Sequence, residues 1–166
     1  MDRSQYNKCV ENYADGLFRF VFSGLRKRED AEDVVQESFV RVWEKVKQID
    51  FATAKSYLYT TAYHLMVDET RRCQRLSPID ECCIIEQQNI SNSYPDVSQI
   101  LDKALATLPE IQRTVITLRD YEGYSYQEIG DITNLSESQV KVYIFRARTA
   151  LKKQLGSIDN LIDTAS

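Results

Sequence analysis

The 166-residue chain is poor in residues that break helices, with five glycines and three prolines. Such a composition favours helices over a fold built on many tight turns. The sequence also has no apolar run approaching the roughly 20 residues that a transmembrane helix needs. Its N-terminal residues lack the apolar stretch of a signal peptide. We therefore expect an all-α protein that has no direct membrane insertion and stays in the cytoplasm.

Residue combinations that perform catalysis or bind metals are missing as well. Cys9, Cys73, Cys82 and Cys83 do not have the spacing of a zinc site, and His64 alone cannot complete one. We find no nucleophile paired with a base and no glycine-rich phosphate loop. The sequence therefore predicts no enzymatic activity, no metal and no cofactor. Adjacent Cys82 and Cys83 are typical of free thiols in a reducing compartment, and a redox role that includes Cys73 stays open.

The charge of the chain is acidic overall but uneven. The net charge is −4, with a pI near 5.1, which argues against a nonspecific DNA coat. Residues 136–155 nevertheless hold five Lys and Arg against one Glu, a local balance of +4. This distribution fits a protein with a basic patch for DNA and an acidic surface for another partner.

The most informative segment is residues 125–140, where two helix starts flank a turn. Each start carries a capping-box pair, in which the side chains satisfy unpaired backbone donors. The pairs are Ser125 with Glu128 and Ser136 with Gln139. Asn134 at the turn tolerates left-handed backbone geometry, and close approach of the second helix would explain Gly130. The pattern predicts a helix-turn-helix, which lays its second helix in the DNA major groove; an ordinary helical hairpin is the alternative.

The second of these helices is expected to run from Ser136 to about Leu155, with two distinct faces. The buried stripe should comprise Val140, Ile144, Ala147, Leu151 and Leu155. The candidate DNA-binding face comprises Ser138, Gln139, Lys141, Val142, Phe145 and Arg146. Val142 and Phe145 suit thymine methyl groups, whereas Lys141 and Arg146 suit guanine edges or phosphates. The alternative is a basic solvated helix with Phe145 packed on a neighbour.

The N-terminal half should form three helices, over about residues 5–23, 30–48 and 54–75. The middle helix should bury Ala31, Val35, Val42, Val46 and Ile49. Its other face carries Asp33, Gln36, Glu37, Val40 and Trp43. These acids exceed what helix capping needs, and apolar residues among them favour a partner protein over a merely solvated face.

The third helix combines aromatic and basic residues on the side opposite its expected core residues Leu58, Ala62 and Leu65. The members of that side are Lys55, Tyr57, Tyr59, Tyr63, His64, Arg71, Arg72 and Arg75. Aromatic rings beside cations form stacking platforms for unpaired bases next to a phosphate track. Tyrosines at the edge of an ordinary core are the alternative interpretation.

Residues 77–96 separate the two halves. The segment holds Pro78 and Pro95 among polar and acidic residues, which is typical of a linker. A short helix should follow over residues 100–106, broken at Leu108-Pro109. The sequence thus predicts two small helical domains, at residues 1–76 and 97–158, joined by a flexible acidic linker over 77–96 and followed by a tail at 159–166.

Two stretches resemble a known family. Residues 30–43 (DAEDVVQESFVRVW) closely resemble the polymerase-binding helix of bacterial sigma factors. Residues 108–113, 124–129 and 140–148 resemble the promoter-binding C-terminal domain of these proteins. Two such domains with a short linker are similar to the extracytoplasmic-function (ECF) group of the sigma-70 family, and the resemblance covers about residues 6–155.

The resemblance implies an alternative sigma factor that binds RNA polymerase core and directs promoter-specific initiation. Sigma region 2, at residues 1–76, would dock on the clamp of the largest polymerase subunit through Asp33, Gln36, Glu37, Val40 and Trp43. It would capture the melted −10 strand through Lys55, Tyr57, Tyr63, His64, Arg71, Arg72 and Arg75. The loop over residues 50–53 would help to hold an extruded base.

Sigma region 4, at residues 97–158, would read the −35 duplex through Ser138, Gln139, Lys141, Val142, Phe145 and Arg146. The resemblance also implies contact with the polymerase flap and control by an anti-sigma factor. The chain departs from the family at Tyr57, where tryptophan is frequent, and at His64, where asparagine is frequent. Val142-Tyr143 stands where Ser-Arg is common, which favours an A·T-leaning −35 site. A free-standing helix-turn-helix regulator that ignores polymerase, or an adaptor that sequesters a sigma inhibitor, are the alternatives.

Overall fold

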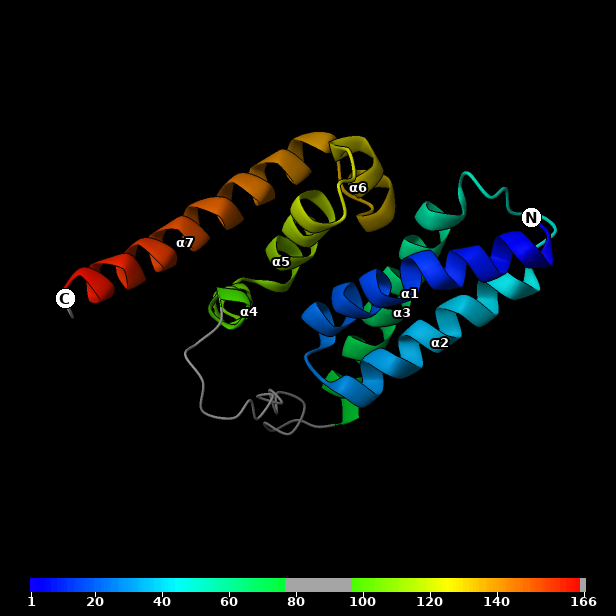
Figure 1. Ribbon diagram of the computed structural model, residues 1–166, viewed down its shortest axis with the longest axis horizontal. Coiled ribbons are helices and arrows are strands. Elements are labelled where there is room, and N and C mark those ends of the chain that lie inside the picture. Colours follow the sequence, from blue (N-terminus) through cyan, green and yellow to red (C-terminus); the bar gives the residue numbers. More distant parts are fainter. Residues whose placement is uncertain (77–96, 165–166) are drawn as a thin grey trace. The chain divides into compact units, whose positions relative to one another are not determined.

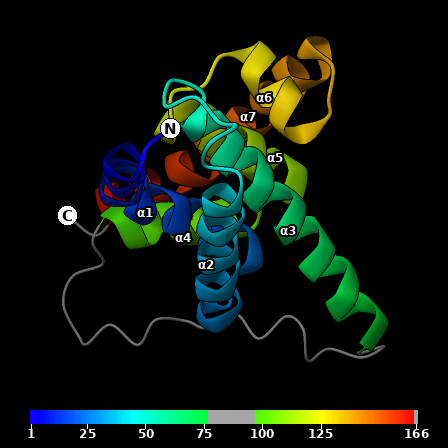
Figure 2. The same ribbon diagram turned by 90° about the vertical axis from the view of Figure 1, so that its right-hand side faces the viewer.

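The computed structural model describes residues 1–76 and 97–164, and all regular structure within these residues is helical (Figures 1 and 2). The expected linker over residues 77–96 and the end of the tail lie outside the described residues. The chain forms two compact units. The prediction of an all-α fold is confirmed for the described part of the chain.

The N-terminal unit is built from α1 (Arg3–Leu25), α2 (Arg28–Glu44) and α3 (Ala54–Leu76), each of which packs on the other two. Figure 1 shows α1 and α2 running side by side, joined by a short turn. Asp2 begins α1 with a capping box, because its carboxylate accepts from the Gln5 backbone N–H at 2.8 Å while the Gln5 amide oxygen accepts from the Asp2 N–H at 2.9 Å. The α1–α2 turn uses a left-handed Arg26, with φ 59°.

The core of this unit differs from the prediction in the phase of two helices. On α2, Val34, Ser38 and Phe39 are buried with Ala31 and Val42, whereas the expected Val35 is half-buried. Val46 is half-buried too, because α2 ends at Glu44 and the chain turns away from the helical phase.

The largest correction to the core concerns Tyr59, which is fully buried rather than exposed on the nucleic-acid side. Its ring packs against Phe20 of α1, with centroids 5.4 Å apart. Tyr59 lies three residues before Ala62 and seven before Met66, both fully buried, so helical periodicity places it on the core face. Tyr59 therefore belongs to the core and is not part of the candidate stacking platform.

The described residues of the C-terminal unit form four α-helices and a π-helix. They are α4 (Val97–Ala106), α5 (Glu110–Ile116), the π-helix η2 (Thr117–Tyr121), α6 (Tyr126–Thr133) and α7 (Glu137–Thr164). The predicted break at Leu108-Pro109 is confirmed, since α4 stops before it and α5 starts after it. Part of the core forms where α4 and α5 meet α7, from Ala104, Leu105, Leu108, Ile116, Ala147 and Leu151.

The helix-turn-helix within α6 and α7 has the predicted local geometry. Glu128 accepts from the Ser125 N–H at 2.8 Å, and Ser125 Oγ accepts from the Glu128 N–H at 3.2 Å. The second box, between Ser136 and Gln139, has corresponding distances of 3.0 and 3.2 Å. Asn134 adopts φ 58°, as its position in the turn predicts. Both helix starts therefore follow from residues three apart in the chain.

Two details of this motif differ from the expectations. A Cβ at Gly130 would lie 2.6 Å from the Leu135 carbonyl oxygen, so the turn backbone, and not the second helix, excludes a side chain there. The buried stripe of α7 contains Val140, Ile144, Ala147 and Leu151 but not Leu155, which is 36% exposed. α7 nevertheless continues to Thr164, beyond the predicted end.

Candidate protein and nucleic-acid interfaces

The acidic face of α2 presents all five residues that the sequence assigned to a partner protein. Asp33, Gln36 and Glu37 are exposed, and Val40 and Trp43 are 49% and 45% exposed in spite of their apolar side chains. These positions recur at helical spacing, so they share one side of α2. The structure therefore brings this group together on one surface.

Trp43 is held in place by a residue that sequence reasoning left out. The Tyr6 ring lies 4.8 Å from the Trp43 ring, centroid to centroid, at an interplanar angle of 60°. The Tyr6 hydroxyl donates to the Phe39 carbonyl at 3.1 Å, and burial raises the pKa of Tyr6, with a smaller contribution from Cys9. The Tyr6 ring of α1 therefore restricts the orientation of the exposed Trp43 indole.

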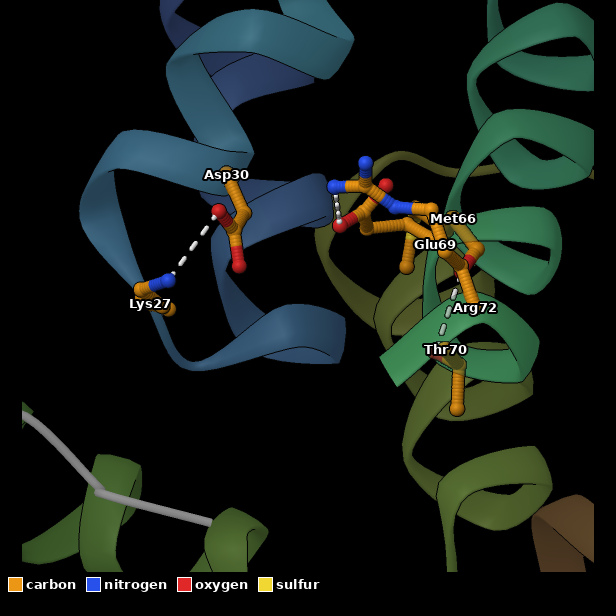
Figure 3. Close-up of polar contacts among 6 residues, drawn as sticks. All are labelled: Lys27, Asp30, Met66, Glu69, Thr70 and Arg72. Carbon is orange, nitrogen blue, oxygen red and sulfur yellow. Dashed lines mark hydrogen bonds and ion pairs between the residues drawn. The ribbon is translucent and has the colours of Figure 1, made fainter. Parts of the chain in front are cut away.

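Near the other end of α2, charged side chains form two pairs of residues three apart, one at the start of α2 and one on α3 (Figure 3). Lys27 contacts Asp30 at 3.3 Å, and Arg72 contacts Glu69 at 2.7 Å, and these hydrogen bonds raise the pKa of both cations. Asp30, Glu69 and Cys73 bring their ligand atoms within 4.8 Å of one another. Because each carboxylate already has a cationic partner, the cluster is balanced by the protein itself.

An open acidic groove of about 260 Å³ continues the α2 face toward α3. Its lining consists of Asp30, Asp33, Val34, Glu37, Leu65, Asp68, Glu69 and Arg72. The acidic surface is therefore wider than the face that the sequence predicted, since Asp68 and Glu69 of α3 contribute to it.

The basic and aromatic residues of α3 divide into separate groups. Helical periodicity places Tyr57, His64, Arg71 and Arg75 along one stripe, and the last three are exposed. Lys55 lies elsewhere, with its ammonium over the rings of Tyr13 at 5.9 Å and Tyr59 at 5.8 Å. The two remaining predicted residues, Tyr63 beside His64 and Arg72 paired with Glu69, stand on the flanks of the stripe. The structure thus brings together four of the seven predicted residues.

An open pocket of about 450 Å³ lies at the start of this stripe. It is lined by Lys45, Gln48, Ile49, Thr53, Ser56, Tyr57 and Thr60. The Lys45 ammonium is 5.9 Å from the Tyr57 ring centroid, and Thr53 closes a turn by donating to the Asp50 carbonyl at 3.1 Å. Sequence reasoning missed Lys45 and Gln48, because it counted them as part of α2.

The exposed face of α7 presents the whole set of predicted DNA-binding residues. Ser138, Gln139, Lys141 and Arg146 are exposed, as are Val142 at 46% and Phe145 at 72%. A phenyl ring so exposed is not packed on a neighbour. The alternative interpretation, in which Phe145 packs against another part of the protein, is therefore wrong. The Gln139 amide oxygen is already engaged by the capping box.

Several charged residues around α7 were not singled out from the sequence. Arg148 contacts Asp120 through two hydrogen bonds, and Arg119 lies over the Tyr126 ring at 4.5 Å from its centroid. The first contact joins residues 28 positions apart and the second joins η2 to α6, so no pattern within one helix marks either of them. None of the helices in the described part of the chain has the length and apolar character needed to cross a membrane.

Comparison with known proteins matches each of the two units to a region of one protein family. A model of sigma-70 region 2 matches residues 9–76, and a model of sigma-70 region 4 matches residues 98–151. The chain is 28% identical over 150 residues to the ECF RNA polymerase sigma factor SigM of Bacillus subtilis, covering 88% of this chain and 92% of that protein. It is 30% identical over 176 residues to the ECF RNA polymerase sigma-E factor of Escherichia coli, covering 93% and 88%.

A solved structure of the sigma factor RpoE with the anti-sigma factor NepR from Bartonella quintana is similar to the chain as well. The TM-score is 0.78 at 25% identity, over 91% of this chain and 96% of that one. The sigma regions occur in the same order as the two units of the fold, and these two relatives are matched over 92% and 88% of their own length. The chain therefore belongs to the ECF group of the sigma-70 family and is a non-enzymatic factor that directs promoter-specific transcription initiation by RNA polymerase.

Proposed function

We propose a division of labour among three surfaces of this sigma factor. The α2 face binds the polymerase core, the α3 stripe with its pocket captures the melted −10 strand, and the α7 face reads the −35 duplex. The corresponding domains are region 2 at residues 1–76, a linker at 77–96, region 4 at 97–158 and a tail at 159–166. Support for this assignment comes from the order of the matched family regions, 9–76 and 98–151.

The α2 face has the composition of a protein interface rather than a nucleic-acid one. Its carboxylates repel phosphate, while Val40 and Trp43 expose apolar area that a protein partner would cover. Because Tyr6 already fixes Trp43, little side-chain freedom is lost when the indole is buried by the clamp of the largest polymerase subunit.

The α3 stripe suits an unpaired strand. Tyr57 and His64 offer stacking surfaces, while Arg71 and Arg75 offer cations for phosphates farther along the same stripe. The pocket beside Tyr57 gives an extruded base a place to enter, with the loop over residues 50–53 along its edge. Lys55, Tyr63 and Arg72 flank the strand in this proposal and act as secondary contacts.

The observation that carries the −35 assignment is the exposure of Phe145 at 72% and Val142 at 46% on a basic helix face. The opposite face of α7 is buried, so these apolar side chains cannot be explained by the core. Lys141 and Arg146 flank them with charge for guanine edges or phosphates, while the apolar pair suits thymine methyls. We infer an A·T-leaning −35 element.

The chain is also proposed to bind an anti-sigma factor and to act in the bacterial cytoplasm with its polymerase. RpoE of Bartonella quintana was solved with the anti-sigma factor NepR, and CnrH, of similar fold at a TM-score of 0.66 and 24% identity, with the cytosolic domain of CnrY. The exposed apolar residues on α2 and α7 are the surfaces of this chain that such a partner would cover.

Transcription in vitro on a random promoter library tests the proposed function. Purified chain with core polymerase should select promoters that share an upstream and a downstream element and start RNA at fixed positions. Core alone should select none, and the chain alone should not enrich DNA. Enrichment by the chain without core would support a free-standing regulator and contradict the proposal.

A further inference from the structure

Tyr126, the first residue of α6, lies where three elements of the C-terminal unit meet. The Arg119 guanidinium from η2 is 4.5 Å from the Tyr126 ring centroid, and the Lys141 ammonium from α7 is 5.5 Å from it. Arg148, also on α7, is close enough to Tyr126 for an electrostatic interaction that contributes to the raised pKa of Arg148, after the larger effect of Asp120. One half-buried ring therefore has cations from two neighbouring elements around it.

Each of these cations is fixed from a second side. Arg119 donates to the Tyr124 carbonyl at 2.8 Å, and Lys141 contacts Glu137 at 2.8 Å. Arg148 contacts Asp120 through two hydrogen bonds, of 2.5 and 3.3 Å. With two partners apiece, these long side chains have a defined direction that a single exposed ion pair would not impose.

Lys141 depends on the ring more than the two arginines do. Its other partner, Glu137, lies one turn earlier on the same helix, and both side chains are more than half exposed. Such an i,i+4 pair holds a lysine weakly and is screened by salt. Without the Tyr126 ring, the Lys141 ammonium would sample many positions along the edge of α7.

We propose that Tyr126 is a positioning residue for promoter recognition, whose ring orders Lys141 for contact with the −35 element. The inference rests on the proposed role of the α7 face in reading duplex DNA. Ordering the lysine before binding lowers the entropy lost in the complex, so the ring increases affinity without touching the bases. Because Lys141 is next to Val142 on the recognition face, its direction also affects which base pair is discriminated.

The test compares Tyr126→Leu with Tyr126→Phe in the full-length chain bound to core polymerase, on a promoter chosen by library selection. Tyr126→Leu removes the ring and is expected to weaken promoter binding roughly fivefold, with less discrimination at the base pair that Lys141 contacts. Tyr126→Phe keeps the ring and should stay within about twofold of the parent. Equal losses for both variants would assign the effect to the hydroxyl and overturn the proposal.

A double-mutant cycle separates positioning from a general structural role. In a Lys141→Ala background, Tyr126→Leu should cause no further loss, whereas in a Lys152→Ala background it should cause its full loss. Lys152 is the matched control because it is an exposed lysine on the same side of α7, about three turns beyond Lys141 and outside the six residues assigned to DNA. Full loss in the Lys141→Ala background would overturn the inference. If Lys141→Ala itself leaves promoter binding unchanged, that result contradicts the proposed DNA-binding role of Lys141, on which the role of Tyr126 depends.

A measurement on the unmutated chain covers the case in which Tyr126→Leu does not fold. With lysine labelled at Cε, the Lys141 methylene should show an upfield shift from the Tyr126 ring and slower motion than that of Lys152. The shift should persist in Tyr126→Phe. A Lys141 signal as mobile as that of Lys152, without the upfield shift, would contradict the proposal.

Discussion

The guanidinium of Arg148 contacts the carboxylate of Asp120 through two hydrogen bonds, so the recognition helix α7 is tied to η2 across 28 positions of the chain. The hydrogen bond to Asp120 raises the pKa of Arg148, whose guanidinium is protonated in proteins. The pair is partly exposed, with 50% of the Arg148 side chain and 39% of Asp120 accessible.

Removing this pair should therefore have a small, salt-dependent effect. We expect Asp120→Asn to lower the free energy of unfolding by about 0.5 kcal/mol at low salt and by less at high salt, because exposed pairs are screened. Urea unfolding of the full-length chain at two salt concentrations measures this. Arg148→Gln should give a similar loss, and the double variant should lose no more than either single one. Losses that add fully would show that the two side chains do not interact.

The crossing of α1 and α3 predicts a larger effect. A Cβ at Gly24 would clash with the Met66 Cε, and Met66 is fully buried. Gly24→Ala should lower the free energy of unfolding by about 1 kcal/mol through overpacking, because the flexible end of the buried Met66 side chain must shift to make room. The matched control is Gly156→Ala on α7, where a Cβ meets no atom within 4 Å; it should raise stability by about 0.5–1 kcal/mol. A neutral Gly24→Ala would show that Met66 moves aside without cost.

Substitutions on α2 test the polymerase-binding face. Gln36→Ala with Glu37→Lys should abolish binding to core polymerase, because it places a cation on an acidic, exposed surface while leaving the core intact. The control is Glu11→Lys, the same charge change at an exposed position of α1. Binding is measured by retention of core polymerase on immobilised chain, and thermal unfolding checks the fold. Retention of polymerase at the level of the parent would remove the assignment of this face.

On α7, Arg146→Ala distinguishes base reading from phosphate contact. If Arg146 bonds a guanine edge, the variant should lose about 1–3 kcal/mol of promoter binding and relax the preference at one −35 position. Selection from a library randomised over the −35 element measures both quantities. A uniform loss across all sequences, with a smaller dependence on salt, would instead assign Arg146 to a phosphate.

The apolar pair on the same face should set the base composition of the element. We expect Val142→Ala with Phe145→Ala to reduce the preference for thymine in that library, because both exposed side chains suit its methyl group. The control is Thr149→Ala, an exposed position one turn beyond Phe145. A G·C-rich optimum for the unmodified chain would contradict the A·T-leaning prediction directly.

Local spacing predicted much of this molecule. The two capping boxes and the left-handed Asn134 follow from residues within a few positions of each other, and each was confirmed. The apolar face of α7 was predicted as far as Leu151, because a helix of constant phase repeats its buried positions. The prediction that Leu155 is buried was wrong, because periodicity does not reveal where the neighbouring helices end.

Contacts between helices were much less predictable. Tyr59 was grouped with other tyrosines by chemistry, although its phase with Ala62 and Met66 places it in the core. The assignment of Lys55 to DNA stays a prediction, but the sequence did not reveal that its ammonium lies over Tyr13 of α1. The cations around Tyr126 come from η2 and α7, and no spacing within one helix indicates such a set. Predicting them requires the packing of elements distant in the chain.

The central claim is that the N-terminal unit contacts an opened strand while the C-terminal unit contacts closed duplex. Photo-crosslinking from Tyr57 and Phe145, each replaced in turn by p-benzoylphenylalanine, tests this directly in the complex of chain, core polymerase and promoter. The account predicts that position 57 crosslinks to the −10 region only after the strands separate, and that position 145 crosslinks to the −35 region already in closed duplex. Crosslinks from position 57 to closed duplex, or from position 145 to the melted strand, would contradict it.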